Sequence, residues 1–195
     1  MLEGKNIAIY CASSTKVRPA FFAAAHRLGK IFAENKITMV FGAGNMGLMG
    51  EAADAVAEVG GKMIGVIPNF MIEQNWHHKA CTELIVTDGM SDRKQTIEHI
   101  SDAFVALPGG IGTMDELFEC MVNKQLGLHT KPIIILNVDG YYDGLIKLLD
   151  QMVQEQMMRP VQGIMYQVVN SPEEVLPAIA NAPEWDRNAR KHAKI

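Results

Sequence analysis

The chain has 195 residues, of which 48% are apolar and 21% charged, so it is long enough for one sizeable core and short for two typical domains. Its net charge of −4 gives no reason to expect a nucleic-acid polymer or an anionic membrane as a partner. No apolar run approaches the ~18 residues of a membrane span, and the first residues lead directly into an apolar strand, so we expect no signal peptide and a cytoplasmic protein.

Apolar strands alternate with helices along the chain. The first strand is expected at residues 7–11 and is followed by an amphipathic helix at residues 19–34. Further strands are expected at residues 37–41, 63–67, 83–87, 103–107 and 132–136, and further helices at residues 51–59, 92–101, 114–126, 141–157 and 171–181. Whether a helix lies between residues 67 and 83 stays open. This alternation predicts a single-domain α/β fold, a three-layer, Rossmann-like, doubly wound parallel sheet.

A glycine-rich segment follows the second strand. Gly42, Gly44 and Gly47 have the spacing of the dinucleotide-binding motif between a strand and a helix. The rest of that motif fails, because the next strand ends in Pro68-Asn69 where an acidic residue should hold the ribose hydroxyl. NAD is therefore disfavoured, and binding of a phosphate or nucleotide by this loop is retained.

The most informative stretch is PGGIGTMDE, residues 108–116, between an apolar strand and an amphipathic helix. Its glycines allow a tight turn and close approach to a ligand, and the unpaired N–H groups and dipole at the start of the helix favour a phosphate. Thr113 and Glu116 also fit a capping box, in which both side chains serve only the end of the helix. A plain cap does not need three glycines, so the pattern favours a ligand site with a carboxylate beside it.

Four segments follow the carboxyl ends of predicted strands. They are Ser13-Ser14 and residues 42–50, 90–94 and 108–116. Right-handed crossovers place these ends along one edge of a parallel sheet, where ligands bind at the topological switch point. Arg93 and Lys94 taken alone would be an ordinary charged helix face, but this position favours Arg93 as a ligand contact, with Met90 beside a base.

These motifs together resemble the lonely guy family. The matching residues are Gly42-x-Gly44-x-x-Gly47-Leu48-Met49-Gly50, Met90-Ser91-Asp92-Arg93-Lys94 and Pro108-Gly109-Gly110-x-Gly112-Thr113-x-x-Glu116, and the likeness runs to about residue 181. The chain departs from the family pattern at Ala12, at Ala43 and at Ser91-Asp92, which bears on the substrate more than on the reaction.

The resemblance implies a cytokinin riboside 5′-monophosphate phosphoribohydrolase, a class long mislabelled as lysine decarboxylases. Such an enzyme hydrolyses the N-glycosidic bond of AMP or an N6-substituted AMP to free base and ribose 5-phosphate, with no metal or organic cofactor. Glu116 and Arg93 are the catalytic candidates. The substrate- and phosphate-binding candidates are Ser13, Ser14, Gly44, Gly47, Met90, Lys94, Pro108, Gly109, Gly110, Gly112 and Thr113.

Three alternatives stay open. The chain could be a general purine or pyrimidine nucleotide nucleosidase. It could be a non-catalytic nucleotide or cofactor carrier on the same fold, although a carrier does not need both Arg93 and Glu116. A pyridoxal-phosphate decarboxylase needs a Schiff-base lysine with its own phosphate cup and pyridinium partner, and Lys94 is the only lysine in the motifs.

Other features have plainer interpretations. Trp76-His77-His78 is expected to form a loop wall rather than a metal site, because no third ligand has metal-site spacing. The three widely spaced cysteines, Cys11, Cys81 and Cys120, are expected to be reduced, buried thiols. We assign residues 1–182 to the domain and residues 183–195 to a basic tail, which carries Arg187, Arg190, Lys191 and Lys194 and is a solvated helix or disordered.

The family resemblance also implies a homodimer with its active site near the subunit contact. Two predicted helices carry apolar faces that could take part, or that could be filled entirely by the parent sheet. These faces comprise Met114, Leu117, Phe118, Met121 and Val122 on one helix and Ile97 and Ile100 on the other.

Overall fold

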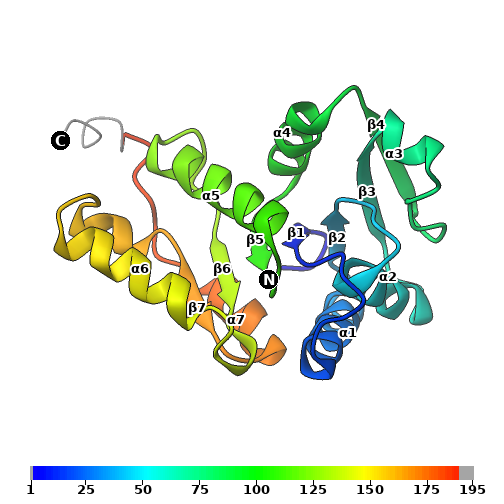
Figure 1. Cartoon of the computed structure of the whole chain (residues 1–195), viewed down its shortest axis with the longest axis horizontal. Helices are drawn as coiled ribbons and strands as arrows, with labels where there is room; N and C mark the ends of the chain where they lie inside the picture. Colours follow the sequence, from blue (N-terminus) through cyan, green and yellow to red (C-terminus); the bar gives the residue numbers. More distant parts are fainter. Residues whose placement is uncertain (1, 189–195) are drawn as a thin grey trace.

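The structure, a computed structural model, describes residues 2–188 and is built on a seven-stranded sheet in which every strand pair is parallel. The strand order is β4-β3-β2-β1-β5-β6-β7 (Figure 1). The strands are β1 Asn6–Tyr10, β2 Thr38–Phe41, β3 Met63–Pro68, β4 Glu83–Thr87, β5 Ala103–Ala106, β6 Ile133–Leu136 and β7 Gln167–Val169. The predicted doubly wound α/β fold is therefore confirmed.

Helices cover both faces of the sheet and produce the predicted three layers (Figure 1). The helices are α1 Pro19–Glu34, α2 Gly47–Glu58, α3 Asn69–Glu73, α4 Met90–Ile100, α5 Ile111–Gln125, α6 Asp143–Gln154 and α7 Val175–Ala180. Residues of α1, α2 and α7 pack in one apolar cluster, and residues of α4, α5 and α6 pack in the other.

The strands are apolar throughout because both of their faces are buried. In β1, Ile7 and Ile9 belong to the α1–α2 side of the core, whereas Ala8 and Tyr10 belong to the α4–α5 side. The same alternation recurs in β5 and β6. This is the pattern expected for side chains that point to opposite faces at successive positions of a doubly covered strand.

The structure adds to or differs from the sequence prediction in several elements. The last strand, β7, was not predicted, because it has three residues and only Val169 is buried. The open interval after β3 holds the short helix α3. Helix α2 begins at Gly47 and α5 at Ile111, earlier than expected. The predicted helix at residues 171–181 is a 3-10 turn, Pro172–Glu174, followed by α7, and the Ser171 side chain does not cap it.

The connection that follows β1 ties the two halves of the sheet together. The amide of Ala12 donates to the carbonyl of Pro108 at 3.1 Å, and the carbonyl of Ala12 accepts from the amide of Leu48 at 2.9 Å. The start of α2 and the turn before α5 are thus held on either side of the end of β1. This is the topological switch point, where the chain crosses to opposite sides of the sheet.

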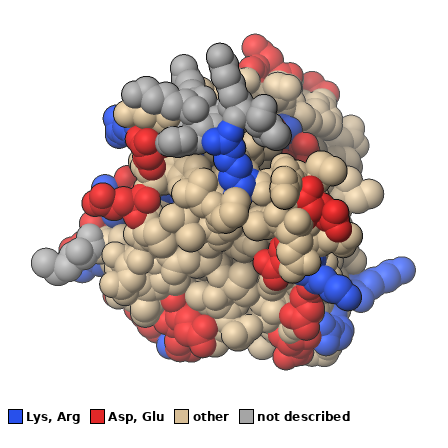
Figure 2. Space-filling model, turned by 90° about the vertical axis from the view of Figure 1, so that its left-hand side faces the viewer, with Lys and Arg blue, Asp and Glu red and all other residues tan. Residues whose placement is uncertain are grey.

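One face of the molecule has a mixed distribution of charged side chains. Figure 2 shows the side of the molecule at the left of Figure 1, where acidic and basic side chains are interspersed, so the described part of this face has no broad basic patch. No helix among the described residues is long and apolar enough to cross a membrane.

At the end of the described chain, the Trp185 indole N–H donates to the carbonyl of Lys124 at 2.6 Å. Arg190, Lys191 and Lys194 of the tail lie outside the described residues.

Candidate active site

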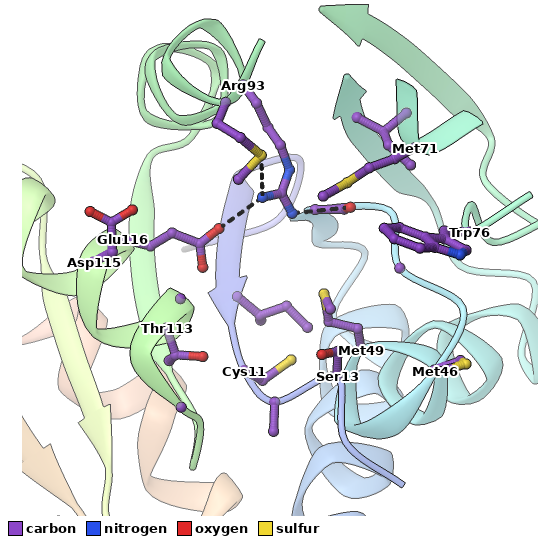
Figure 3. Close-up of a pocket in the computed structure, with 18 of the residues that line it drawn as sticks. Cys11, Ser13, Met46, Met49, Met71, Trp76, Arg93, Thr113, Asp115 and Glu116 are labelled. Atoms are coloured by element: carbon purple, nitrogen blue, oxygen red, sulfur yellow. Dashed lines mark hydrogen bonds and ion pairs between the residues drawn. The ribbon is translucent and has the colours of Figure 1, made fainter. Parts of the chain in front are cut away.

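A cavity of about 550 Å³ opens at the carboxyl edge of the sheet, at the switch point. It is lined by Ile9, Cys11, Ala12, Ser13, Gly42, Gly44, Asn45, Met46, Met49, Ile67, Met71, Trp76, Met90, Arg93, Gly110, Ile111, Gly112, Thr113, Asp115 and Glu116. All four segments that the sequence places at this edge contribute to it. Figure 3 shows Glu116 and Thr113 on one wall, Trp76 and Met71 on the opposite wall, and Arg93 between them.

Arg93 is a buried cation braced by backbone carbonyls. Its Nε donates to the carbonyl of Val66 at 3.1 Å and its Nη2 to the carbonyl of Gly42 at 3.2 Å. A Cβ at position 42 would overlap the guanidinium, so glycine is required there by the close approach of Arg93. Two bonds to rigid strand ends fix the guanidinium plane, and its remaining nitrogen, Nη1, points toward α5.

Glu116 meets Arg93 from the second turn of α5. Arg93 Nη1 lies 3.4 Å from Glu116 Oε1, and the Glu116 side chain is only 13% exposed. Burial raises the pKa of Glu116 to about 7, against smaller opposing effects that include attraction to Arg93. Near neutral pH this carboxyl group therefore populates both its charged and its neutral form, a property that acid–base and electrostatic catalysis both exploit.

The capping alternative for Glu116 is wrong. The residue at the N-cap of α5 is Gly110, no side chain caps the helix, and Thr113 is buried within its first turn. The carboxylate is therefore available to the cavity. The amides of Ile111, Gly112 and Thr113 belong to the helix start, where backbone donors lack intrahelical partners and favour an anion.

Two tyrosines hold the turn that precedes α5. The Tyr141 hydroxyl donates to the carbonyl of Gly109 at 2.6 Å, and the Tyr142 hydroxyl donates to the carbonyl of Leu107 at 2.5 Å. With these carbonyls held on the outside, the turn has a fixed orientation before any ligand binds. Neither tyrosine belongs to the motifs that the sequence singled out.

The loop after β2 has two residues with left-handed backbone. Gly47 has a φ of 62°, and a Cβ there would collide with the backbone of Ser13. Ala43 has a φ of 58°, which is uncommon for alanine, at the position where the lonely guy pattern has glycine. The loop is held across from another segment, because Gly44 pairs with His77 in an antiparallel bridge.

Eight of the thirteen predicted site residues line the cavity. These are Ser13, Gly44, Met90, Arg93, Gly110, Gly112, Thr113 and Glu116. The other five lie just outside its lining and serve its frame. Ser14 caps a turn at Lys16, Gly47 contacts Ser13, Pro108 and Gly109 accept hydrogen bonds, and Lys94 pairs with Asp115 at 2.9 Å and with Glu119.

Sequence reasoning missed an apolar and sulfur-rich wall of the cavity. Its members are Met46 and Met49 at α2, and Met71 and Trp76 at α3 and the loop beyond it. Trp76 was predicted only as part of a loop wall. Trp76 could have been recognised from its position in the connection that leaves the carboxyl end of β3, because such connections lie at the ligand-binding edge of a parallel sheet.

Cys11 also lines the cavity but is not activated. Burial raises the pKa of its thiol, and the nearby Glu116 carboxylate adds to the effect. A thiol that stays protonated is a poor nucleophile, so the site has no cysteine thiolate at neutral pH. All three cysteines are free; Cys11 and Cys120 are buried as predicted, whereas Cys81 is only partly buried.

A group of possible metal ligands, Glu98, Cys120 and His129, lies apart from the cavity lining. The His129 Nδ1 accepts the amide N–H of Lys131 at 3.2 Å, so its Nε2 carries the proton and donates to the carbonyl of Cys120 at 3.0 Å. Both ring nitrogens are thereby used. The Glu98 carboxylate accepts from Asn123 at 2.7 Å, and this group is best described as a structural hydrogen-bond network.

The fold and cavity define a Rossmann-like α/β protein with a glycine-framed ligand site and a buried Arg–Glu pair. Comparison with known sequences makes the class specific: the sequence profile of the family described as "Possible lysine decarboxylase" matches residues 49–179. The chain is 37% identical over 188 residues to a cytokinin riboside 5′-monophosphate phosphoribohydrolase of Arabidopsis thaliana, covering 96% of this chain and 87% of that protein. It is 41% identical over 156 residues to a probable enzyme of the same name from Oryza sativa subsp. japonica, covering 80% of this chain and 69% of that protein. The chain therefore belongs to the lonely guy family of phosphoribohydrolases.

Solved structures share the fold at lower identity. The molybdenum cofactor binding protein of Rippkaea orientalis superposes with a TM-score of 0.69 at 22% identity, covering 92% of this chain and 98% of that one. The Moco carrier protein of Chlamydomonas reinhardtii gives 0.69 at 22% identity, covering 91% and 96%. These likenesses establish the common fold alone.

Proposed function

We propose that this chain hydrolyses the N-glycosidic bond of a nucleoside 5′-monophosphate, AMP or an N6-substituted AMP of the cytokinin type. The products are the free base and ribose 5-phosphate. The names of the 37–41% identical relatives support the reaction class. The observation that carries the proposal is the placement of the Arg93–Glu116 pair in the same cavity as the glycine turn and the start of α5.

Glu116 acts on the ribose in this proposal. Cleavage of the bond passes through an oxocarbenium-like ribose with positive charge at C1′, which a carboxylate stabilises electrostatically. Arg93 Nη1 contacts Oε1, which leaves the second carboxylate oxygen to face the cavity. Arg93, fixed by Val66 and Gly42, orients that carboxylate. The ionised form of Glu116 is the active one.

The 5′-phosphate is bound at the beginning of α5. The backbone amides of Ile111, Gly112 and Thr113 and the Thr113 hydroxyl provide donors, and the helix dipole adds attraction. The bonds from Tyr141 and Tyr142 hold the turn in place. Binding of the remote phosphate then helps to position C1′ beside Glu116.

The alternative functions, a decarboxylase and a non-catalytic carrier, fit the site less well. A pyridoxal-phosphate decarboxylase needs a Schiff-base lysine, and no lysine is among the described residues that line the cavity. Lys94 is held instead by Asp115 and Glu119. A carrier would need the glycine segments but would gain nothing from a buried carboxylate whose pKa is close to 7.

The test is a panel of 5′-monophosphates and their matching nucleosides, with the released bases separated by chromatography. We expect cleavage of AMP or an N6-substituted AMP and little cleavage of the nucleosides. Glu116→Gln should abolish turnover with nucleotide binding kept. Glu119→Gln, one turn further and outside the cavity lining, is the matched control and should stay active. Equal rates on adenosine and AMP would overturn the phosphate site, and an active Glu116→Gln would overturn the chemistry.

The proposal includes a cytoplasmic homodimer. Most of the apolar side chains considered for the contact are packed within the chain itself: Leu117, Met121 and Ile97 are buried in the core. Met114, Phe118 and Ile100 are partly buried against it. Val122 on α5 is 49% exposed, and Leu126, the C-cap residue that follows the helix, is 38% exposed. Light scattering at micromolar concentration should give twice the chain mass, and a mass near 21.5 kDa would refute the dimer.

A further inference from the structure

Trp76 is a large aromatic side chain held half in water at the edge of the cavity. Its side chain lines the cavity and the residue is 50% exposed. A tryptophan in this position gives up much of the stabilisation that burial would bring, since an indole removed from water contributes one of the largest apolar areas of any residue. Trp76 is not among the residues of either apolar core cluster of the described chain.

The backbone that carries Trp76 is firmly attached to the glycine loop. The carbonyl of Trp76 accepts from the amide of Asn45 at 3.0 Å, and the amide of Trp76 donates to the carbonyl of Met71 at 3.2 Å. The next residue, His77, forms the antiparallel bridge with Gly44. The indole is therefore presented on a braced segment rather than on a free loop.

The surroundings of Trp76 contrast with the opposite wall. Figure 3 shows Met71, Met49 and Met46 on the same side of the cavity as the indole, while Glu116 and Thr113 face them from α5. Methionine sulfur is polarizable and packs well against flat rings. The cavity thus has a polar half suited to ribose and phosphate and an apolar half suited to a flat, weakly polar group.

We propose that Trp76 is the base-stacking residue of this site, with the purine ring of the nucleotide lying against its indole. This inference rests on the proposed function for the identity of the ligand. With the phosphate at the start of α5 and C1′ beside Glu116, the base extends across the cavity toward the Trp76 wall. Stacking on an aromatic face tolerates many bases, because every base has a π-face. Trp76 therefore determines how tightly the base end is held and leaves the polar half unaffected.

A kinetic test measures binding of the base and binding of the ribose phosphate separately. The variants are Trp76→Ala and Trp76→Phe, with Trp185→Phe as the control at the other tryptophan, which contacts Lys124 on α5. The readouts are KM for the best nucleotide of the panel and the inhibition constant of the product ribose 5-phosphate. Trp76→Ala should raise KM roughly tenfold, in line with about 1.4 kcal/mol of stacking, and Trp76→Phe roughly twofold. The inhibition constant of ribose 5-phosphate should stay within about twofold in each variant.

A spectroscopic test does not depend on turnover. The chain has two tryptophans, so Trp76 is the single tryptophan of the Trp185→Phe variant. AMP should quench its fluorescence, and ribose 5-phosphate should not. This measurement also decides the matter if Trp76→Ala fails to fold.

The outcomes distinguish this inference from the proposed function. An unchanged KM in Trp76→Ala, or equal weakening of nucleotide and ribose 5-phosphate, would overturn the stacking role while the hydrolase stands. Quenching by AMP in a protein that hydrolyses no nucleotide would support stacking and overturn the hydrolase. Hydrolysis with no quenching by any nucleotide would overturn the stacking role alone.

Discussion

Replacing Glu116 by glutamine should stabilise the protein above neutral pH while removing its activity. Glu116 is buried beside Arg93, and burial holds its pKa near 7 rather than at the ordinary 4.5. The folded protein therefore binds this proton more tightly than the unfolded chain does. The resulting stabilisation is complete below about pH 4.5 and is lost as the pH rises through 7.

The size of the effect follows from the two pKa values. At about 1.36 kcal/mol per pKa unit, ionisation of Glu116 costs the folded state about 3 kcal/mol at high pH. A glutamine is neutral at every pH, resembles the protonated acid in shape, and still offers Arg93 an oxygen acceptor. The difference in unfolding free energy between Glu116→Gln and wild type should thus grow by roughly 2–3 kcal/mol between pH 5 and pH 8.

Urea unfolding of both proteins at pH 5, 6, 7 and 8 measures this difference directly. All other titrating groups are common to the two proteins, so their contributions largely cancel, and equal m-values would show that the unfolding reaction is the same. A difference that stays constant with pH would refute the raised pKa. A difference that shifts in favour of wild type at high pH would mean that attraction to Arg93 outweighs burial.

Three further predictions concern the frame and the chemistry of the site. For wild type, kcat/KM should rise with pH through an apparent pKa near 7, because the proposed active form of Glu116 is the ionised one. The value at pH 6 should be about tenfold lower than the value at pH 8, and a flat profile would contradict this assignment. Gly42→Ala should lower kcat/KM at least tenfold by displacing the Arg93 guanidinium, whereas Gly144→Ala, a helix position with open space around it, should leave the rate unchanged. Tyr141→Phe should raise KM for the nucleotide roughly threefold to tenfold with little change in stability, because the bond to Gly109 orients the phosphate turn; an unchanged KM would remove Tyr141 from that role.

The pairing of Arg93 with Glu116 could be anticipated because topology alone brings them together. Each follows the end of a parallel strand, and the carboxyl ends of such strands meet at one edge. What could not be anticipated is how Arg93 is held. Its partners are the carbonyls of Val66 and Gly42, and backbone acceptors leave no trace in a side-chain motif.

Element boundaries predicted from local helix and strand propensity were wrong where tertiary contacts determine the structure. Helix α5 begins at Ile111 and includes Gly112, although glycine weakens a helix, because the turn held by Tyr141 fixes where the helix starts. Strand β7 escaped prediction because three residues with a single buried side chain give no periodic signal. The wall around Trp76 belongs to a short helix and a loop, and such segments have no period to detect.

The two walls of the cavity come from different segments of the chain, so each wall can change without the other. The wall that carries Glu116 comes from residues 110–116, whereas the Trp76 and methionine wall comes from residues 46–76, and Arg93 of α4 lies between them. Under the proposed function, substitutions in the second segment alter which base is accepted and leave Glu116 and Arg93 in place. On that proposal, new substrate ranges arise, by selection or by engineering, through changes at the start of α2, in α3 and in the loop that follows α3.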